Sequence, residues 1–134
     1  MRVFLDANFL IAAGLKPLGD YNRVLETDLD QFVTSEHLLN EVSRNLKRLD
    51  LDPVEFISRL RKRFEITDQF NILPAGLPLD GAGDRQALAE AIGARCDVFV
   101  TSDTDFGDLF GQNVRGVLIE KSARYARRIV DIPG

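Results

Sequence analysis

The sequence predicts a three-layer α/β/α domain with a central, mainly parallel sheet. Three short, continuous apolar runs have the pattern of strands buried on both faces: Val3–Leu5, Val98–Val100 and Val117–Ile119. Segments with helical periodicity separate these runs, and this alternation is typical of parallel sheets. Because 134 residues are enough for one domain with its own core, a single domain is expected over residues 1–134.

Strands and helices follow each other closely in the first third of the chain. A short helix is expected over "FLIAAGL", after the first apolar run, and it is closed by Gly14. A second strand is expected at Phe32–Val33, and Thr34 or Ser35 is expected to cap the next helix. The apolar residues of that helix recur at helical spacing, at Leu38, Leu39, Val42, Leu46 and Leu49.

Pro53 occupies the first turn of a further predicted helix, a position that proline favours. The run "FNIL" before Pro74 is the next expected strand. A loop rich in glycine and proline, residues 76–83, leads into the helix "DRQALAEAIGAR", and "KSARYARRIV" is expected to form the closing helix. The apolar stripe of the helix that Pro53 starts consists of Val54, Ile57, Leu60 and Phe64.

The net charge of -4 and the pI near 5.0 constrain any binding of nucleic acid, since proteins that bind polyanions through general electrostatics are usually basic. Binding would require local basic patches or cations held by acidic groups. Each basic cluster in the sequence could hold phosphates or an acidic segment of a partner, or be a solvated helix face. The two clusters are Lys121, Arg124, Arg127 and Arg128, and Arg59, Arg61, Lys62 and Arg63.

Cysteine content and apolar runs bear on the location of the protein. Cys96 is the only cysteine, so it cannot form an internal disulfide, and it is expected to be a packing residue. No apolar run approaches the roughly 20 residues that a membrane-spanning helix needs. Asp6 and Asn8 interrupt the apolar N-terminus, which argues against a signal peptide. A cytoplasmic protein without a membrane partner is expected.

Carboxylates follow two of the predicted strands. Asp6 closes the first strand and Asp103 follows the strand at Val98–Val100, so neighbouring parallel strands would bring both acids to one sheet edge, where sites form. Asp84 opens the alanine-rich helix near the middle of its apolar stripe, so its carboxylate is expected to point inward. Glu41 lies at the border of an apolar stripe, from which it faces either a cleft or water.

These acids also have purely structural interpretations. Asp84 is a candidate N-cap of its helix, and Asp103 and Asp105 are candidate turn and cap residues for a short helix at residues 106–110. Glu41 has the alternative of a solvated helix charge. The sequence alone leaves these alternatives open.

A cluster of carboxylates at one sheet edge requires a compensating cation, because the groups repel one another and are costly to bury unpaired. Oxygen ligands without histidine or cysteine favour Mg²⁺ or Mn²⁺ over Zn²⁺, and the only histidine, His37, is expected at the surface. Mg²⁺ commonly bridges carboxylates to phosphate oxygens. The cluster therefore indicates phosphoryl transfer or phosphodiester hydrolysis.

Two other classes of protein with acids at strand ends fit this sequence poorly. A response-regulator receiver domain needs an adjacent acidic pair at the first strand, and a haloacid-dehalogenase phosphatase needs Asp-x-Asp after it. Here the first strand ends in Asp-Ala-Asn, with Asn8 in place of the second acid. Both classes are therefore set aside.

Four blocks of the sequence resemble the PIN-domain ribonucleases, in order and at suitable separations. They are "VFLDANFLIAA", "SEHLLNEVSRNL", "GDRQALAEAIGARCDVFVTSDTDF" and "GVLIE", and the resemblance runs from Met1 to about Ala123. The third block is the most specific, with an acid that opens an alanine-rich helix, an apolar strand, and then Thr-x-Asp-x-Asp-Phe. The resemblance implies a PIN-like α/β/α fold.

The resemblance places the family's acidic quartet on Asp6, Glu41, Asp84 and Asp103. Asp6, Asp84 and Asp103 would hold one or two Mg²⁺ or Mn²⁺ ions, and Glu41 would hold a metal-bound water or accept a proton. Weaker, auxiliary positions match Asn8, Thr101 and Asp105. Asp80 in the preceding loop competes with Asp84 for the third position of the quartet.

The family implies a metal-dependent ribonuclease that hydrolyses RNA phosphodiester bonds and leaves a 5′-phosphate and a 3′-hydroxyl. Many compact members are toxins of toxin–antitoxin pairs and many are dimeric, so an antitoxin partner and a homodimer are also implied. The alternative is a PIN-like scaffold that binds RNA or protein without catalysis. The presence of all four acids favours the enzyme.

Overall fold

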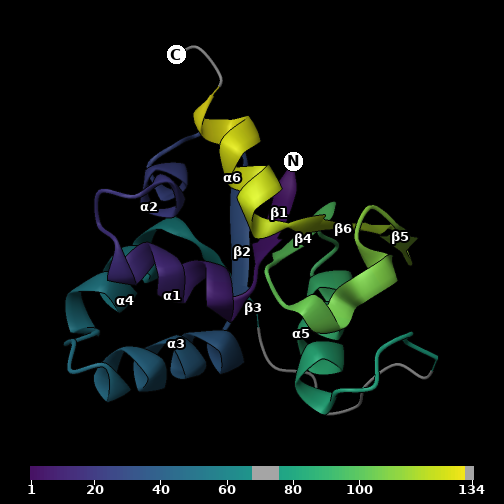
Figure 1. Cartoon of the computed structure of the whole chain (residues 1–134), viewed down its shortest axis with the longest axis horizontal. Coiled ribbons are helices and arrows are strands. Elements are labelled where there is room, and N and C mark those ends of the chain that lie inside the picture. The colour runs from purple at the N-terminus through teal and green to yellow at the C-terminus, as the bar shows by residue number, and fades with distance from the viewer. Residues whose placement is uncertain (68–75, 132–134) are drawn as a thin grey trace.

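The computed structural model describes residues 1–67 and 76–131, which form a six-stranded sheet in the order β3-β2-β1-β4-β6-β5 (Figure 1). Every pairing is parallel except that of β5 with β6. The predicted fold class, an α/β/α fold with a mainly parallel sheet, is confirmed. The strands are β1 (Arg2–Leu5), β2 (Gln31–Ser35), β3 (Glu65–Thr67), β4 (Val98–Thr101), β5 (Asn113–Val114) and β6 (Val117–Lys121).

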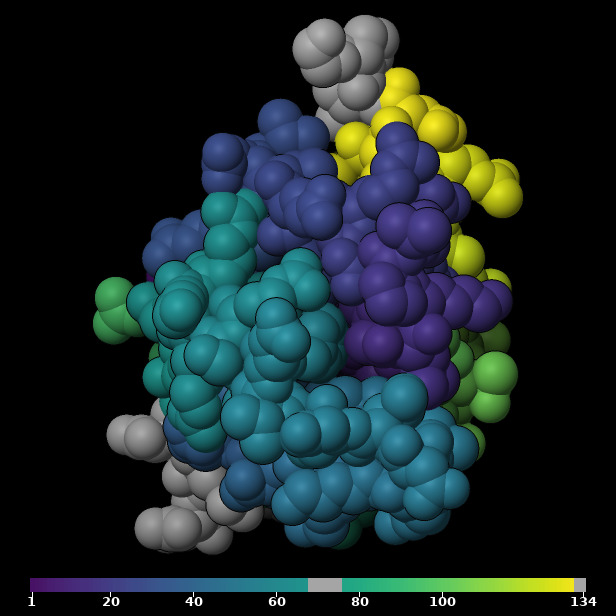
Figure 2. Space-filling view, turned by 90° about the vertical axis from the view of Figure 1, so that its left-hand side faces the viewer, coloured from purple at the N-terminus to yellow at the C-terminus, as the bar shows by residue number. Residues whose placement is uncertain are grey.

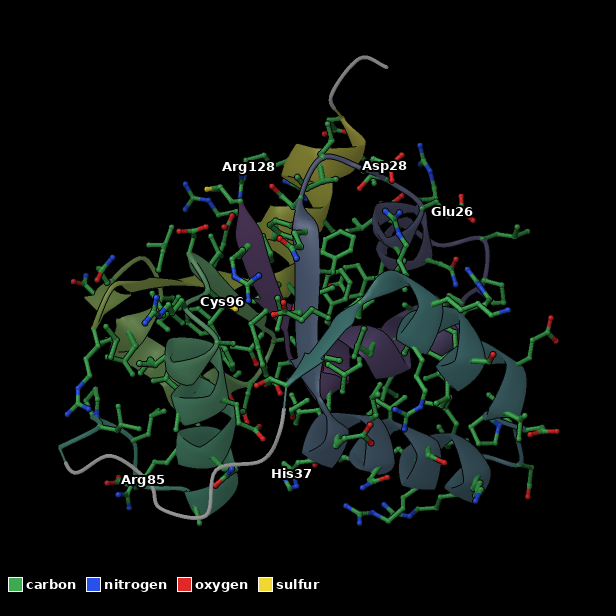
Figure 3. The ribbon with its side chains drawn as sticks, turned by 180° about the vertical axis from the view of Figure 1, so that it is seen from behind. Glu26, Asp28, His37, Arg85, Cys96 and Arg128 are labelled. Carbon is green, nitrogen blue, oxygen red and sulfur yellow. The ribbon has the colours of Figure 1, made fainter. Side chains whose placement is uncertain are left out.

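Helices cover both faces of this sheet. The first and last helices lie on one face and α5 lies on the other (Figures 1 and 3), while α3 packs against α1 and α4 packs against α3. Helices α3 and α4 form much of the face seen in Figure 2. The helices are α1 (Ala7–Leu15), α2 (Asp20–Leu25), α3 (Glu36–Arg48), α4 (Val54–Arg63), α5 (Ala82–Gly93) and α6 (Ser122–Val130), and a 3₁₀ segment, η1 (Thr104–Leu109), follows β4.

The two central strands, β1 and β4, form the middle of the core. Phe4 and Phe99 are fully buried and stack with their ring centroids 5.5 Å apart. Burying each such side chain contributes about 1.5–3 kcal/mol, which fixes the two strands side by side. Their register pairs Leu5 with Val100, so the residues that follow both strands meet at the same edge of the sheet.

Several helix boundaries differ from the predicted ones by one or two residues. Helix α1 begins at Ala7 because the Asp6 side chain accepts a hydrogen bond from the Ala7 N–H, and it continues through Gly14. Ser35 caps α3, as predicted. Helix α5 begins at Ala82, ahead of the predicted start, and its N-cap is Gly81.

The apolar stripe of α4 is only partly confirmed. Leu60 and Phe64 are buried, but Val54 is 70% exposed. Val54 was wrongly placed in the core, because it is the first residue of α4 and precedes the part of the helix that packs inward. Leu49, predicted in the stripe of α3, is also exposed because it is the C-cap of that helix.

Three elements were absent from the predictions: α2, β3 and the two-residue strand β5. Helix α2 has six residues and no side-chain cap, so it is too short to show helical periodicity. Strand β3 follows α4 almost directly, at Glu65–Thr67. The strand predicted over "FNIL" lies outside the described residues.

Candidate metal centre

A cavity of about 270 Å³ opens at the carboxyl edge of the sheet, beside the first turns of α1, α3 and α5. Four acids line it: Asp6 after β1, Glu41 in α3, Asp84 in α5 and Asp103 after β4. The fold thus brings together all four acids that the resemblance selected, from four separate segments.

Asp6 is the most buried of these acids, with a relative exposure of 8%. One carboxylate oxygen accepts a hydrogen bond from the Ala7 N–H at 2.8 Å, and the other accepts from the Thr101 hydroxyl at 2.7 Å. Burial raises the pKa of Asp6 to about 6, against the opposing effect of these hydrogen bonds, and the charges of Glu41 and Asp103 raise it further. Asp6 is therefore held by two hydrogen bonds and has no ion-pair partner among the described residues.

The Thr101 hydroxyl connects Asp6 to the other strand end. It accepts hydrogen bonds from the Asn8 side-chain amide at 3.2 Å and from the Asp103 N–H at 3.1 Å, while it donates to Asp6. The Asn8 amide oxygen accepts from the Ser102 N–H at 3.2 Å. Two of the three predicted auxiliary residues, Asn8 and Thr101, thus fix the geometry of the acids around them.

Asp84, Asp103 and Asp105 form a tight cluster in which one carboxylate oxygen from each lies within 4.8 Å of the others. Burial raises the pKa of Asp84 to about 7, and hydrogen bonding to Asp103 and the charge of Asp103 add to the rise. The glycine at position 81 leaves room for the Asp84 carboxylate, since a Cβ there would lie 3.2 Å from Asp84 Oδ2. Asp6 lies outside this tightest cluster but lines the same cavity.

The structure decides separately for each acid whether it is only a helix cap or a solvated charge. Asp103 does cap η1, because its Oδ1 accepts from the Asp105 N–H at 2.9 Å, yet its carboxylate also belongs to the acidic cluster. Asp84 is not the N-cap of α5, which is Gly81. Glu41 is half-buried and lines the cavity, so it is more than a solvated helix charge.

The structure adds lining residues that the sequence analysis did not select. His37, expected at the surface, is half-buried and lines the cavity together with Asn45. Both lie four residues from Glu41 in α3, so helical spacing around a candidate acid was the signal that could have found them. Asp80 is exposed and does not line the cavity, which leaves Asp84 as the acid that does.

A further carboxyl group, that of Glu90 in α5, is fully buried behind the cavity. Its Oε1 accepts a hydrogen bond from the Ser35 hydroxyl at 2.9 Å, and Ser35 Oγ in turn accepts from the Leu38 N–H as the cap of α3. Burial raises the pKa of Glu90. The pair Glu90–Ser35 therefore links α5, which carries Asp84, to α3, which carries Glu41.

The donor set suits a hard divalent cation. Among the described residues, none of the acids of the cavity forms an ion pair with a lysine or arginine. Their oxygens are the ligands that Mg²⁺ and Mn²⁺ prefer, and neither His37 nor Cys96 completes a zinc-type set. Cys96 is buried, and burial raises its pKa to about 12, so it is a packing residue as predicted.

Two further findings concern the helices: their length and apolarity, and the ion pairs of the basic cluster in α4. None of the helices in the described residues is long and apolar enough to cross a membrane. In the basic cluster of α4, Arg61 forms an ion pair with Glu36, and Arg63 forms one with Asp28. These two arginines are therefore already engaged within the chain.

Comparisons with known proteins give a structural match without a sequence match. No protein-family model and no curated protein matches the chain. Among solved structures, the chain is similar to one from VapBC2 of Rickettsia felis, crystallised bound to a DNA fragment from its promoter. The two share 20% sequence identity with a TM-score of 0.60 over 90% of this chain and 98% of that chain. The chain therefore has the PIN-like fold that its sequence motifs predicted.

Proposed function

We propose that the chain is a metal-dependent endoribonuclease that hydrolyses RNA phosphodiester bonds. The observation that carries this proposal is the convergence of Asp6, Glu41, Asp84 and Asp103 on one cavity at the carboxyl edge of a PIN-like sheet. Among the described residues these acids have no cationic partner, and two of them have a raised pKa, which is the arrangement expected of a site that binds a cation.

The residues of the cavity would have three roles: metal binding, proton acceptance and positioning. Asp6, Asp84 and Asp103 would hold Mg²⁺ or Mn²⁺, with Asp105 as an auxiliary ligand, and the ion would supply charge neutralisation and a water of lowered pKa. Glu41 would accept the proton of the attacking water. Thr101 and Asn8 would position Asp6 and Asp103 through the hydrogen bonds described above.

We further propose that the protein is the toxin of a toxin–antitoxin pair. Two findings support this: the resemblance of its motifs to compact PIN-domain ribonucleases, and its structural similarity to a chain of VapBC2.

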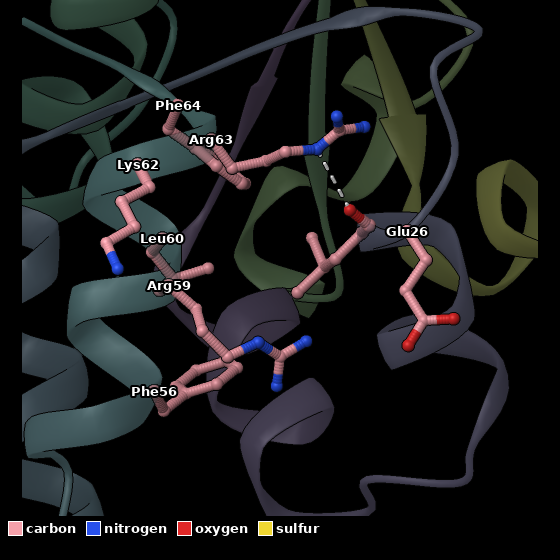
Figure 4. Close-up of a pocket in the computed structure, with 8 residues that line it drawn as sticks. Glu26, Phe56, Arg59, Leu60, Lys62, Arg63 and Phe64 are labelled. Carbon is pink, nitrogen blue, oxygen red and sulfur yellow. Dashed lines mark hydrogen bonds between the residues drawn. The ribbon is translucent and has the colours of Figure 1, made fainter.

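A groove of about 430 Å³ between α2 and α4 has apolar walls from Phe56, Leu60 and Phe64 and a basic rim that includes Lys62 (Figure 4). Such a groove suits an amphipathic segment of a partner that carries acidic residues. A homodimer is a further expectation from the same resemblance.

Cleavage of labelled RNAs of mixed sequence, with Mg²⁺, with Mn²⁺ and with EDTA, tests the enzyme directly. Metal-dependent cleavage is expected, and Asp6→Asn and Asp103→Asn are expected to lower the rate by at least about 100-fold, since losing an outer-shell partner alone typically costs 10–100-fold. The matched control is Asp97→Asn at the opposite end of β4, where the carboxylate accepts from the Arg2 N–H. This variant is expected to cleave like wild type.

The alternative is a PIN-like scaffold without catalysis. Wild-type protein that neither cleaves any RNA of the panel nor binds Mg²⁺ or Mn²⁺ by calorimetry would contradict the enzyme and favour the scaffold. Circular dichroism of all variants separates lost chemistry from lost folding.

A further inference from the structure

Helix α6 presents a basic face to solvent. At 3.6 residues per turn, its four cations fall within roughly 120° of the helix circumference. The opposite side of the helix is buried and includes Tyr125, Ala126 and Ile129. The α6 basic face consists of Lys121, Arg124, Arg127 and Arg128, all of them exposed.

The charges of this face are only partly matched within the chain. Arg128 donates to Glu120 at 2.7 Å, and Asp131 is the other carboxylate that lies along the helix. In the part of the chain that the structure describes, Arg124 and Arg127 form no ion pair. Two open cavities, of about 690 and 590 Å³, run along the face, so it is hollow enough to receive a ligand.

Helix stability explains the positions of Arg127 and Arg128, which lie in the last turn of α6, where the negative end of the helix dipole favours cations. It does not explain the positions of the other two cations. Lys121 is the N-cap of α6 and Arg124 lies in its first turn, where the positive end of the helix dipole disfavours cations. Helices α2, α3, α4 and α5 each carry an acid in the first turn, whereas α1 and α6 carry none. A bound anion would relieve this unfavourable arrangement.

The α6 basic face begins next to the acidic cavity. The register of the sheet pairs Lys121 with Thr101, whose hydroxyl donates to Asp6. From that edge α6 runs away from the cavity along one face of the sheet (Figure 1). Arg128 lies at the opposite end of the molecule from His37, which lines the cavity (Figure 3). The cations therefore form a track that leads away from the proposed site of cleavage.

We propose that the α6 basic face binds successive phosphates of the RNA strand whose scissile bond lies in the acidic cavity. This inference rests on the proposed ribonuclease function. A polyanionic strand fits the part of the face around Arg127 better than a protein partner does, because the described residues that line the cavity there are charged apart from Ala123, whereas protein interfaces depend on buried apolar or aromatic anchors. The larger cavity, beside Lys121 and Arg124, also has apolar walls that include Phe110 and Leu118. Arginine side chains also match phosphate geometry through paired N–H donors.

The double substitution Arg124→Gln, Arg127→Gln tests the track. Binding of a fluorescently labelled single-stranded RNA 20-mer is measured by anisotropy in EDTA across a series of salt concentrations. Loss of two phosphate contacts is expected to reduce the slope of log affinity against log salt by about 1.4, and to weaken binding about tenfold or more at about 0.1 M salt. The matched control, Lys47→Gln, Arg48→Gln, makes the same charge change at the exposed end of α3 and is expected to bind like wild type.

Kinetics with Mg²⁺ or Mn²⁺ give a second reading, in which the α6 double variant raises KM while kcat stays near that of wild type. Circular dichroism is expected to show unchanged melting, since both arginines are exposed. Equal losses of RNA affinity in the two double variants would show a general charge effect and would contradict phosphate binding by the α6 basic face. A wild type that cleaves, beside an α6 variant that binds and cleaves equally well, would overturn the track and leave the ribonuclease intact. A folded wild type that neither binds nor cleaves RNA would overturn both.

Discussion

The two edges of the sheet treat acidic residues in opposite ways. At the amino edge, Asp30 accepts from the N-terminal ammonium at 3.2 Å and from the Tyr125 hydroxyl at 2.7 Å, and Glu65 pairs with Arg2. At the carboxyl edge, Asp6 has only uncharged donors, and Asp84 has another carboxylate, Asp103, as its neighbour. Paired acids thus hold the fold together at the amino edge, whereas the acids that line the cavity at the carboxyl edge have no ion-pair partner among the described residues.

This difference has an energetic meaning. Acids with cationic or hydrogen-bonding partners contribute to the free energy of unfolding, whereas acids that are buried or crowded together reduce it. The raised pKa values of Asp6 and Asp84 are the sign of this cost at the carboxyl edge. A cation would offset the cost, which supports the proposal of a metal site at the carboxyl edge.

Removing one acid from the carboxyl edge is expected to have the largest effect on RNA cleavage. It also separates the contribution of that acid to metal binding from its contribution to stability. Mn²⁺ is expected to raise the melting temperature of wild-type protein, and Asp84→Asn should abolish this rise and lower RNA cleavage by at least about 100-fold. Without metal, the same variant should melt above wild type at about pH 8, because a crowded charge has been removed. Differential scanning fluorimetry with and without Mn²⁺ measures both. A metal-free variant that melts well below wild type would contradict the contrast between the edges.

The converse substitution is made at the amino edge. Asp30→Ala leaves the buried Tyr125 hydroxyl without its acceptor and is expected to lower the free energy of unfolding by about 1–3 kcal/mol. Urea denaturation measures this loss, and Asp30→Asn, which keeps an acceptor, should lose less. Cleavage per folded molecule should stay unchanged in both, so a large fall in kcat would show that the edges are not independent.

The pH dependence of stability gives a third, smaller test. Because the pKa values of Asp6 and Asp84 are raised in the folded protein, the native state binds more protons than the unfolded state between about pH 4 and pH 7. The free energy of unfolding of metal-free protein should therefore fall as pH rises from about 5 to about 8, by about 1 kcal/mol from Asp6 alone. Saturating Mn²⁺ should remove this fall, since metal ligands bind in their deprotonated form. Urea titrations at several pH values measure it.

The smallest expected effect concerns Glu90. Glu90→Gln keeps an oxygen that accepts from Ser35 and removes a carboxyl whose pKa burial raises, so stability at about pH 8 should change by less than about 1 kcal/mol. Glu90→Ala removes the acceptor and leaves a cavity, and it should lower both stability and kcat, because the link between α5 and α3 is lost. Activity retained in the Gln variant and reduced in the Ala variant, compared at equal folded fraction, supports a positioning role. Equal activities would contradict it.

Local sequence signals accounted for the sheet and for the candidate acids. Continuous apolar runs predicted β1, β4 and β6, and helical spacing predicted α3 and α5, because burial on both faces or on one stripe leaves a direct trace in residue order. Asp6 and Asp103 were found because strand ends are visible in the sequence. Three elements without such a trace, α2, β3 and β5, were missed because each is too short to build a pattern.

By itself, the sequence determined the fold class and which acids stand at strand ends and helix starts, since these follow from local pattern. Only the tertiary structure decided that β1 lies between β2 and β4, and therefore that Asp6 meets Thr101 across 95 residues of chain. The tertiary structure also decided which acids have a cationic partner. No signal in the neighbouring sequence distinguishes Asp30, which pairs with the N-terminal ammonium, from Asp84, which lies next to the carboxylate of Asp103. The physical reason is that charge compensation depends on distances between segments remote in sequence, and packing of the core sets those distances.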